Sequence, residues 1–232
     1  MRHVPVLALD TSGDITVCVV QPAPDGGHVV LSARRVTEQR RHAEMLAPMI
    51  TAVLDEAGTR RDDLTAVVVG TGPAPFTGLR AGLVTARVLA FALGIEVHGV
   101  CSLDGLAAQA FAAGVRGEVL VVSDARRREV YAARYRLAQG SPPDVELVAG
   151  PAVQTPAVVA ASVAGAVVVG PGTVVYPDLL PAAPGAPLAV DPAVLVTLAL
   201  ARRARGVAQP SEPLYLRRPD VTPALAVKRV TG

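Results

Sequence analysis

Two aspartates are placed where their carboxylates could bind a ligand, because each directly follows a short apolar run. Asp10 is followed by Thr11 and Ser12, and Asp124 ends a second run later in the chain. A carboxylate at a strand end can hold the magnesium of a nucleotide, and nearby hydroxyls can bond a phosphate. The simpler interpretation is a turn in which these side chains bond their own backbone. Both interpretations stay open, and the matching place of Asp124 favours a shared cleft.

The most unusual stretch is the glycine-rich segment GTGPAPFTG at Gly70–Gly78, followed by Leu79 and Arg80. A Walker loop needs a lysine that reaches the β- and γ-phosphates, whereas the only lysine of this chain is Lys228. The segment also lacks the GxGxxG spacing of a dinucleotide-binding fold. We therefore expect a rigid turn that fixes the start of a helix, with Thr77 as the N-cap.

The sequence also lacks the residue patterns of metal sites and of other catalytic sites. The histidines show no metal-ligand spacing and stand at His3, His28, His42 and His98. Cys18 and Cys101 are too few for a disulfide framework or a four-ligand metal site, and we expect reduced core residues. No G-x-S-x-G nucleophile elbow is present. The sequence thus predicts neither a metal site nor a catalytic residue.

Apolar periodicity and turn residues divide the chain into strands and helices. Strands are expected at 4–9, 15–21, 29–36, 64–69, 95–100, 118–123, 129–137, 145–149 and 166–169. Helices are expected at 41–57, 78–93, 102–113, 155–163 and 192–205. Ser102 and Asp191 are the expected N-caps of the third and fifth helices.

The two halves of the chain repeat one order of elements, strand–strand–strand–helix–strand, which the first half extends by a helix and a strand. The segment at 66–73 also resembles that at 166–173. This repetition predicts a duplicated α/β fold with two βββαβα-type halves, the second one reduced, and a cleft between them. The expected domains are 1–100 and 101–232, with the C-terminal tail packing back on the first.

Composition bounds the class of protein. A hydrophobic fraction of 51% with 18% charged residues excludes a disordered chain. A net charge of +2 is too small to predict nucleic-acid binding, and the arginine pairs and the run Arg126–Arg128 are interpreted as solvated faces. Residues 147–177 carry no charge, but prolines and glycines interrupt them, so we expect no membrane span. The N-terminus lacks the pattern of a signal peptide, and a cytoplasmic location is expected.

Five segments, in one order, resemble the bacterial TsaB family. They are LALDTS (Leu7–Ser12), RRHAEMLAPMI (Arg40–Ile50), GTGPAPFTGLRAGLVTA (Gly70–Ala86), SDARRREVYAARY (Ser123–Tyr135) and EPLYLR (Glu212–Arg217). The most specific is the GPxxFTGxRxG pattern at Gly72–Gly82, although Ala74 and Pro75 stand where the family commonly has Gly-Ser. The resemblance implies the fold shared by actin, the sugar and acetate kinases and the heat-shock chaperone ATPase (the ASKHA fold).

The resemblance also implies a function. TsaB-like proteins are non-catalytic partner subunits in making threonylcarbamoyl-adenosine beside the anticodon of tRNAs that read A-starting codons. The implied partners are a TsaD-like transferase, a TsaE-like ATPase, a second copy of the chain in isolation, and tRNA through the complex. The H-x-x-x-H metal motif of the transferase is absent here. No cofactor is implied for this chain, and ATP or ADP at the complex interface stays open.

The resemblance places the partner interface on the two helices of the first half, where methionines and small residues suit helix-on-helix packing. Its predicted members are His42, Met45, Leu46, Met49, Val53, Thr77, Gly78, Arg80, Gly82, Thr85, Ala86 and Leu89. The implied remnants of a nucleotide cleft are Asp10, Thr11, Ser12, Asp124, Gly170 and Gly172.

Two other functions stay open. One is an active enzyme of the same fold, either a small-molecule kinase or a peptidase-like protein, against which the missing lysine, metal ligands and nucleophile elbow all weigh. The other is a partner of an acetyltransferase, which no residue here supports directly. The sequence decides neither between homodimer and heterodimer nor whether the arginine pairs contact tRNA.

Overall fold

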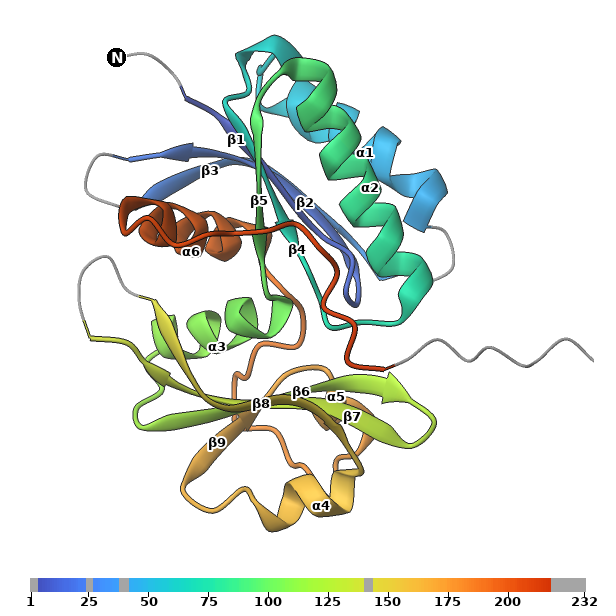
Figure 1. The fold of residues 1–232 in the computed structure, drawn as a ribbon, viewed down its shortest axis with the longest axis vertical. Helices are drawn as coiled ribbons and strands as arrows, with labels where there is room; N and C mark the ends of the chain where they lie inside the picture. The colour runs from blue at the N-terminus through green and yellow to red at the C-terminus, as the bar shows by residue number, and fades with distance from the viewer. Residues whose placement is uncertain (1–3, 24–26, 38–41, 140–143, 218–232) are drawn as a thin grey trace, which may run out of the picture.

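The computed structural model describes residues 4–23, 27–37, 42–139 and 144–217. They form two β-sheets, one from each half of the chain (Figure 1). The strands of the first sheet, in the order β3-β2-β1-β4-β5, are β1 (Val6–Asp10), β2 (Ile15–Pro22), β3 (His28–Val36), β4 (Ala66–Gly70) and β5 (Glu96–Val100). The strands of the second, in the order β8-β7-β6-β9, are β6 (Glu118–Arg126), β7 (Glu129–Leu137), β8 (Val145–Gln154) and β9 (Ala166–Val169).

The two sheets share one topology, which confirms the predicted duplicated α/β fold of the actin and sugar-kinase type. In each, the first strand pairs antiparallel with the second and parallel with the strand that follows a helix. β1 and β4 are buried along their whole length. Strands covered on both faces read as continuous Val/Leu-rich runs, which explains why these strands stand out in the sequence.

Helices separate and flank the two sheets (Figure 1). They are α1 (His42–Glu56), α2 (Phe76–Leu93), α3 (Ser102–Ala112), α4 (Pro156–Ala161), α5 (Gly172–Val175) and α6 (Pro192–Ala204). α1 and α2 cover the outer face of the first sheet, and α6 covers its inner face. α3 lies between α6 and the second sheet, whose far face carries α4 and α5. One large apolar core therefore joins both halves through α3 and α6.

An ion cluster fixes α6 to α3 and to the start of β8. The Arg202 guanidinium of α6 lies 2.8 Å from an Asp104 oxygen of α3 and 2.9 Å from an Asp144 oxygen beside β8. Arg205 also pairs with Asp144, and the Tyr135 hydroxyl donates to Asp104 at 2.8 Å. Since a buried charge is tolerated only when it is paired and hydrogen-bonded, this cluster fixes the position of α6, which covers the first sheet, relative to α3 and β8.

The chain after α6 returns to the first half as an extended segment, residues 209–217, which we call the strap. The Gly99 N–H donates to the Gln209 carbonyl at 3.0 Å, and the Leu214 N–H donates to the Thr71 carbonyl at 2.9 Å. A Cβ on Gly99 would lie 2.2 Å from the Pro210 carbonyl oxygen, so only glycine lets the strap approach β5 this closely. The strap crosses in front of β5 toward the second sheet (Figure 1).

Several local predictions differ from the structure. Thr77 is not an N-cap, because α2 already begins at Phe76 after Pro75. Ser102 is the first residue of α3 rather than its cap, since its hydroxyl bonds Asp10 instead. The sequence missed the short helix α5 after Gly170 and placed the end of β8 five residues too early. The Asp191 cap is confirmed, because its carboxylate accepts the Ala193 N–H at 2.9 Å.

Four regions of the predictions fall wholly or partly outside the described residues. They are the turn at 22–27, Arg40 and Arg41 before α1, the loop holding Pro142 and Pro143, and the tail from 218 onward, which includes Lys228. His3 and the side chain of His42 also lie outside them.

Candidate functional site

Asp10 lies at the end of β1, where the sequence placed it, but its carboxylate is used inside the protein. One oxygen accepts the Ser12 N–H at 2.8 Å and the Ser12 hydroxyl at 2.6 Å. The other accepts the Ser102 hydroxyl at 2.5 Å, and the Ser102 oxygen in turn accepts the Gly72 N–H at 3.1 Å. Burial raises the pKa of Asp10, and the serine hydrogen bonds oppose that rise. The carboxylate thus links β1, the glycine-rich loop and α3, a role that its sequence neighbours did not reveal.

The side chain of Thr11 also forms a hydrogen bond within the protein. Its hydroxyl donates to the Gly78 carbonyl in the first turn of α2 at 2.9 Å. A Cβ added to Gly82, one helical turn later, would lie 2.3 Å from the Thr11 hydroxyl oxygen. Gly82 therefore lets α2 sit close to the end of β1, which is the packing reason for a glycine inside a helix.

The second-half members of the predicted cleft are also engaged locally. The Asp124 carboxylate accepts the Arg126 N–H at 2.9 Å and pairs with the Arg126 guanidinium at 3.2 Å. Gly170 has a φ of 102°, and a Cβ there would lie 2.4 Å from the Val122 carbonyl oxygen. A Cβ on Gly172 would lie 3.0 Å from the Val122 carbonyl carbon. These glycines let α5 lie against the end of β6.

A small cavity lies between the halves, where the predicted cleft should be. Its volume is about 70 Å³, and its lining comes from both halves: Ser12, Gly13, Asp14, Pro73, Ser102, Leu103, Leu106, Ser123, Pro171, Leu188, Ala189 and Val190. Pockets for drug-sized ligands occupy about 300–1,000 Å³. In this arrangement of the halves, the cavity is therefore much smaller than a pocket of that kind.

Most of the predicted partner-interface residues face the protein's own core. Five are buried between α1, α2 and the first sheet: Leu46, Met49, Val53, Gly82 and Ala86. Four are half-buried: Met45, Gly78, Thr85 and Leu89. Thr77 and Arg80 are exposed, and His42 lies at the start of α1. In this structure the five buried residues contact the chain's own core, and their place in a partner interface stays a prediction.

The structure instead exposes an apolar stripe on α2 that the sequence did not single out. Val84 is 58% exposed, Val88 61% and Phe91 89%. Their spacing of four and three residues places them on one face of the helix. The opposite face packs Leu79, Leu83 and Ala86 against the sheet. The sequence carried a partial signal, because Val84, Val88 and Phe91 recur at helical spacing, although Arg80 and Arg87 lie on the same face.

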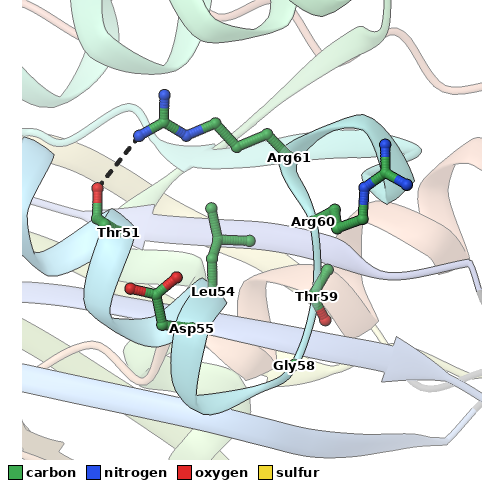
Figure 2. Close-up of a pocket in the computed structure, with 7 residues that line it drawn as sticks. All are labelled: Thr51, Leu54, Asp55, Gly58, Thr59, Arg60 and Arg61. Carbon is green, nitrogen blue, oxygen red and sulfur yellow. Dashed lines mark hydrogen bonds between the residues drawn. The ribbon is translucent and has the colours of Figure 1, made fainter.

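Two open hollows lie at the far end of the first sheet, away from the cleft. Figure 2 shows one of about 360 Å³, where Thr51 and Leu54 of α1 face Arg60 and Arg61 and the Arg61 guanidinium donates to the Thr51 hydroxyl at 3.2 Å. Its neighbour, of about 710 Å³, shares Gly58 and Thr59. Within the part of the chain that the structure describes, no three His, Cys, Asp or Glu side chains gather as metal ligands would.

Comparison with known proteins places the chain in a family. The model of the TsaD family, tRNA N6-adenosine threonylcarbamoyltransferase, matches residues 32–169. A relative named tRNA threonylcarbamoyladenosine biosynthesis protein TsaB, from Escherichia coli, is 34% identical over 56% of this chain and 54% of its own. The TsaB of Bacillus subtilis is 30% identical over 58% of this chain and 56% of its own.

Two further matches cover nearly the whole chain. An uncharacterised protein of Mycobacterium tuberculosis is 43% identical over 94% of both chains. The solved structure of YeaZ from Pseudomonas aeruginosa is 32% identical with a TM-score of 0.74, over 92% of this chain and all of that one. The sequence motifs, the shared fold and these relatives agree, and the chain belongs to the TsaB family.

Proposed function

We propose that this protein is a non-catalytic partner subunit in the synthesis of threonylcarbamoyl-adenosine in tRNA. In this proposal the reaction takes place on a TsaD-like transferase, and a TsaE-like ATPase acts with the pair. The isolated chain forms a homodimer through the same surface. The names of its relatives support the pathway. The observation that carries the role of partner is the exposed stripe Val84, Val88 and Phe91 on α2.

The stripe has the chemistry of a protein interface. Isolated surface apolar residues are ordinary, but three exposed apolar side chains at helical spacing, here flanked by Arg80 and Arg87 on the same face, have the mixed character of an association site. Phe91 has the largest exposed fraction of the stripe and would act as its anchor, because buried aromatic side chains dominate the binding energy of most interfaces. Domain 1–100 carries this surface, as the sequence suggested, but through the outer face of α2 rather than through the α1–α2 contact.

The small volume of the cavity between the halves supports the non-catalytic part of the proposal. The side chains of Asp10, Thr11 and Asp124 form hydrogen bonds within the protein. A kinase or a peptidase-like enzyme of this fold, the alternative function, needs such groups free to face a substrate in the cleft.

The structure contains no helix, among the residues it describes, that is long and apolar enough to cross a membrane. We propose that the protein works in the cytoplasm, where tRNA is modified.

The pathway is tested in cells. We expect depletion of this chain to lower the threonylcarbamoyl-adenosine content of total tRNA, measured by mass spectrometry of digested nucleosides. Re-expression of the wild-type chain should restore it. An unchanged nucleoside level after complete depletion would rule out the proposed pathway.

The interface is tested with purified protein. Full burial of a phenylalanine contributes about 1.5–3 kcal/mol, so Phe91→Ala should weaken pairing with the transferase about 10- to 150-fold. Phe91→Asp should abolish co-elution of the two proteins on a sizing column. Val158→Asp on α4 is the matched control, because Val158 is 55% exposed and lies in the other half of the molecule. Equal co-elution of Phe91→Asp and the control would exclude α2 as the interface.

A further inference from the structure

We propose that the strap and α2 together form the surface through which two copies of this chain pair, with Phe91 of each copy packed against Arg80 and Tyr215 of the other. The inference rests on the proposed function, which assigns pairing to the exposed stripe of α2. It goes beyond that function, because it adds the strap to the surface and names the contact that Phe91 makes.

The strap lies along one side of α2. The Arg87 guanidinium of α2 donates to the Ser211 hydroxyl at 2.9 Å and to a Glu212 carboxylate oxygen at 3.2 Å. Two helical turns earlier, the Arg80 side chain donates to the Tyr215 hydroxyl at 2.7 Å. Residue numbers rise from 211 to 215 along the strap while they fall from 87 to 80 along α2, so the strap runs antiparallel to the helix (Figure 1). The strap and the helix therefore present neighbouring parts of one surface.

The two arginines that contact the strap border the exposed stripe. With about 100° of turn per residue, Arg80 and Arg87 lie about 40–60° to one side of Val84, and Phe91 lies about 20° to that same side. The strap thus holds both arginine side chains next to the stripe. Ordering a long side chain on binding costs conformational entropy, so side chains that are already held lower the cost of pairing.

The position of the strap is set by its backbone. Gln209 accepts a hydrogen bond from β5 at 3.0 Å, and the Leu214 N–H donates to the Thr71 carbonyl at 2.9 Å. Ser211 between them is buried. Because Tyr215 directly follows Leu214, the backbone as well as the side-chain hydrogen bond places its ring beside α2.

The surface carries an aromatic side chain at each end. Phe91 is 89% exposed and lies in the last turn of α2, whereas Tyr215 is 40% exposed and lies beside Arg80 in the first turns. At 1.5 Å per residue, Arg80 and Phe91 are about 16 Å apart along the helix axis, and the midpoint falls between Val84 and Val88. A two-fold axis at that midpoint would set the two α2 helices antiparallel. Each Phe91 would then reach the level of the other copy's Arg80 and Tyr215.

This match favours a second copy over a membrane or an unrelated protein. In a contact of two-fold symmetry the same surface patch serves on both copies, so each contact forms twice. A phenylalanine ring stacks favourably on an aromatic ring and on a guanidinium group. The Arg80 guanidinium carbon lies 5.4 Å from the Tyr215 ring centre, so the two groups offer Phe91 a single place to pack. A stripe alone would fit any apolar partner, whereas a stripe with this pair at its other end fits a copy of itself.

The test is a double-mutant cycle on the dimer. Sedimentation equilibrium of the full chain gives the dissociation constant of the wild type, Phe91→Ala, Tyr215→Ala and the double variant. Each single substitution should weaken the dimer, and the second should weaken it much less when the first is already present. Because an aromatic pair adds to the affinity beyond its buried area and this pair forms twice, the coupling should be about 5- to 150-fold in the dissociation constant.

Two further variants separate this contact from general effects. Tyr215→Phe keeps the ring and should retain most of the affinity. Val158→Ala on α4 removes an exposed apolar group from the second half and should leave the dissociation constant unchanged. Wild-type protein that stays monomeric overturns the inference, as do effects of Phe91→Ala and Tyr215→Ala that simply multiply. Unchanged dimerisation of both variants with lost pairing to the transferase would also overturn it, because the surface would then belong to the transferase alone.

The outcome is independent of the pathway test. Depletion of the chain reports on threonylcarbamoyl-adenosine in cells, whereas the cycle reports on self-association of the purified protein. Strong coupling with an unchanged nucleoside level would remove the proposed function and leave the contact between copies. A lowered nucleoside level without coupling would do the reverse.

Discussion

Replacing Gly82 by alanine tests how closely α2 approaches the end of β1. The added Cβ would lie 2.3 Å from the Thr11 hydroxyl oxygen and 3.1 Å from its methyl carbon. Thr11 is buried and β-branched, and its hydroxyl is held by the Gly78 carbonyl, so it has little freedom to move away. Either the helix shifts outward or Thr11 rotates and loses its hydrogen bond.

The expected cost follows from three contributions. Overpacking a close contact costs about 1–3 kcal/mol, and a lost hydrogen bond costs about 1 kcal/mol. Alanine regains about 1 kcal/mol through its higher helix propensity. The free energy of unfolding should therefore fall by about 1–3 kcal/mol, which lowers the melting temperature by about 2–12 °C in a chain of this size.

Urea unfolding of four proteins measures the effect: wild type, Gly82→Ala, Thr11→Ala and the double variant. Removing the Thr11 hydroxyl should recover most of the loss, so the two substitutions should show a coupling energy well above the scatter of distant pairs. Gly13→Ala is the control, because a Cβ there meets no atom within 4 Å. If Gly82→Ala is as stable as the wild type, the close approach of α2 and Thr11 is refuted. A charged residue at Gly82 or Met49 would likewise report on folding and not on partner binding.

Two further predictions concern buried groups. Asp144→Asn should lower the free energy of unfolding by about 3 kcal/mol, because it removes one partner of the buried Arg202. In the wild type, burial opposes ionisation of Asp144, yet its bonds to Arg202 hold its pKa below the ordinary value. Its stabilisation is therefore complete at neutral pH and is lost as pH falls through the native pKa. In urea titrations the wild-type and variant stabilities should begin to converge only below the ordinary aspartate pKa of about 3.9 and should meet below the native pKa. Cys18 is fully buried, which raises the pKa of its thiol. Cys18 should react with a thiol reagent only at the rate of unfolding, and rapid native labelling at that site would contradict its place in the core.

The repeated order of elements was predictable because it rests on local chemistry. Val67, Val68 and Val69 in β4, and their counterparts in β9, are β-branched residues that favour strands wherever they occur in a buried run. Asp191 before Pro192 marks a helix start by the same local logic. The short helix α5 escaped prediction because only four residues form it, too few for a helical period to appear.

The candidate surfaces were predictable only in part. The sequence pointed to α1 and α2 but selected residues by size and type. It could not tell which side of α2 faces the sheet, because apolar residues recur on both sides of this helix. That choice is made by the contact of Leu79, Leu83 and Ala86 with the first sheet, and it leaves Val84, Val88 and Phe91 outside.

The sequence by itself determined the duplicated α/β order, the family and the absence of a Walker lysine, because these depend on residue types and spacing along the chain. The tertiary structure alone decided what the polar residues do. Asp10 meets Ser102 across 92 positions, and Arg202 meets Asp144 across 58. Contacts at such separations leave no local pattern, since neither residue constrains its sequence neighbours. The positive φ angles of Arg126, Arg127 and Arg128 are decided at this level too, because they belong to the hairpin that the register of β6 against β7 closes.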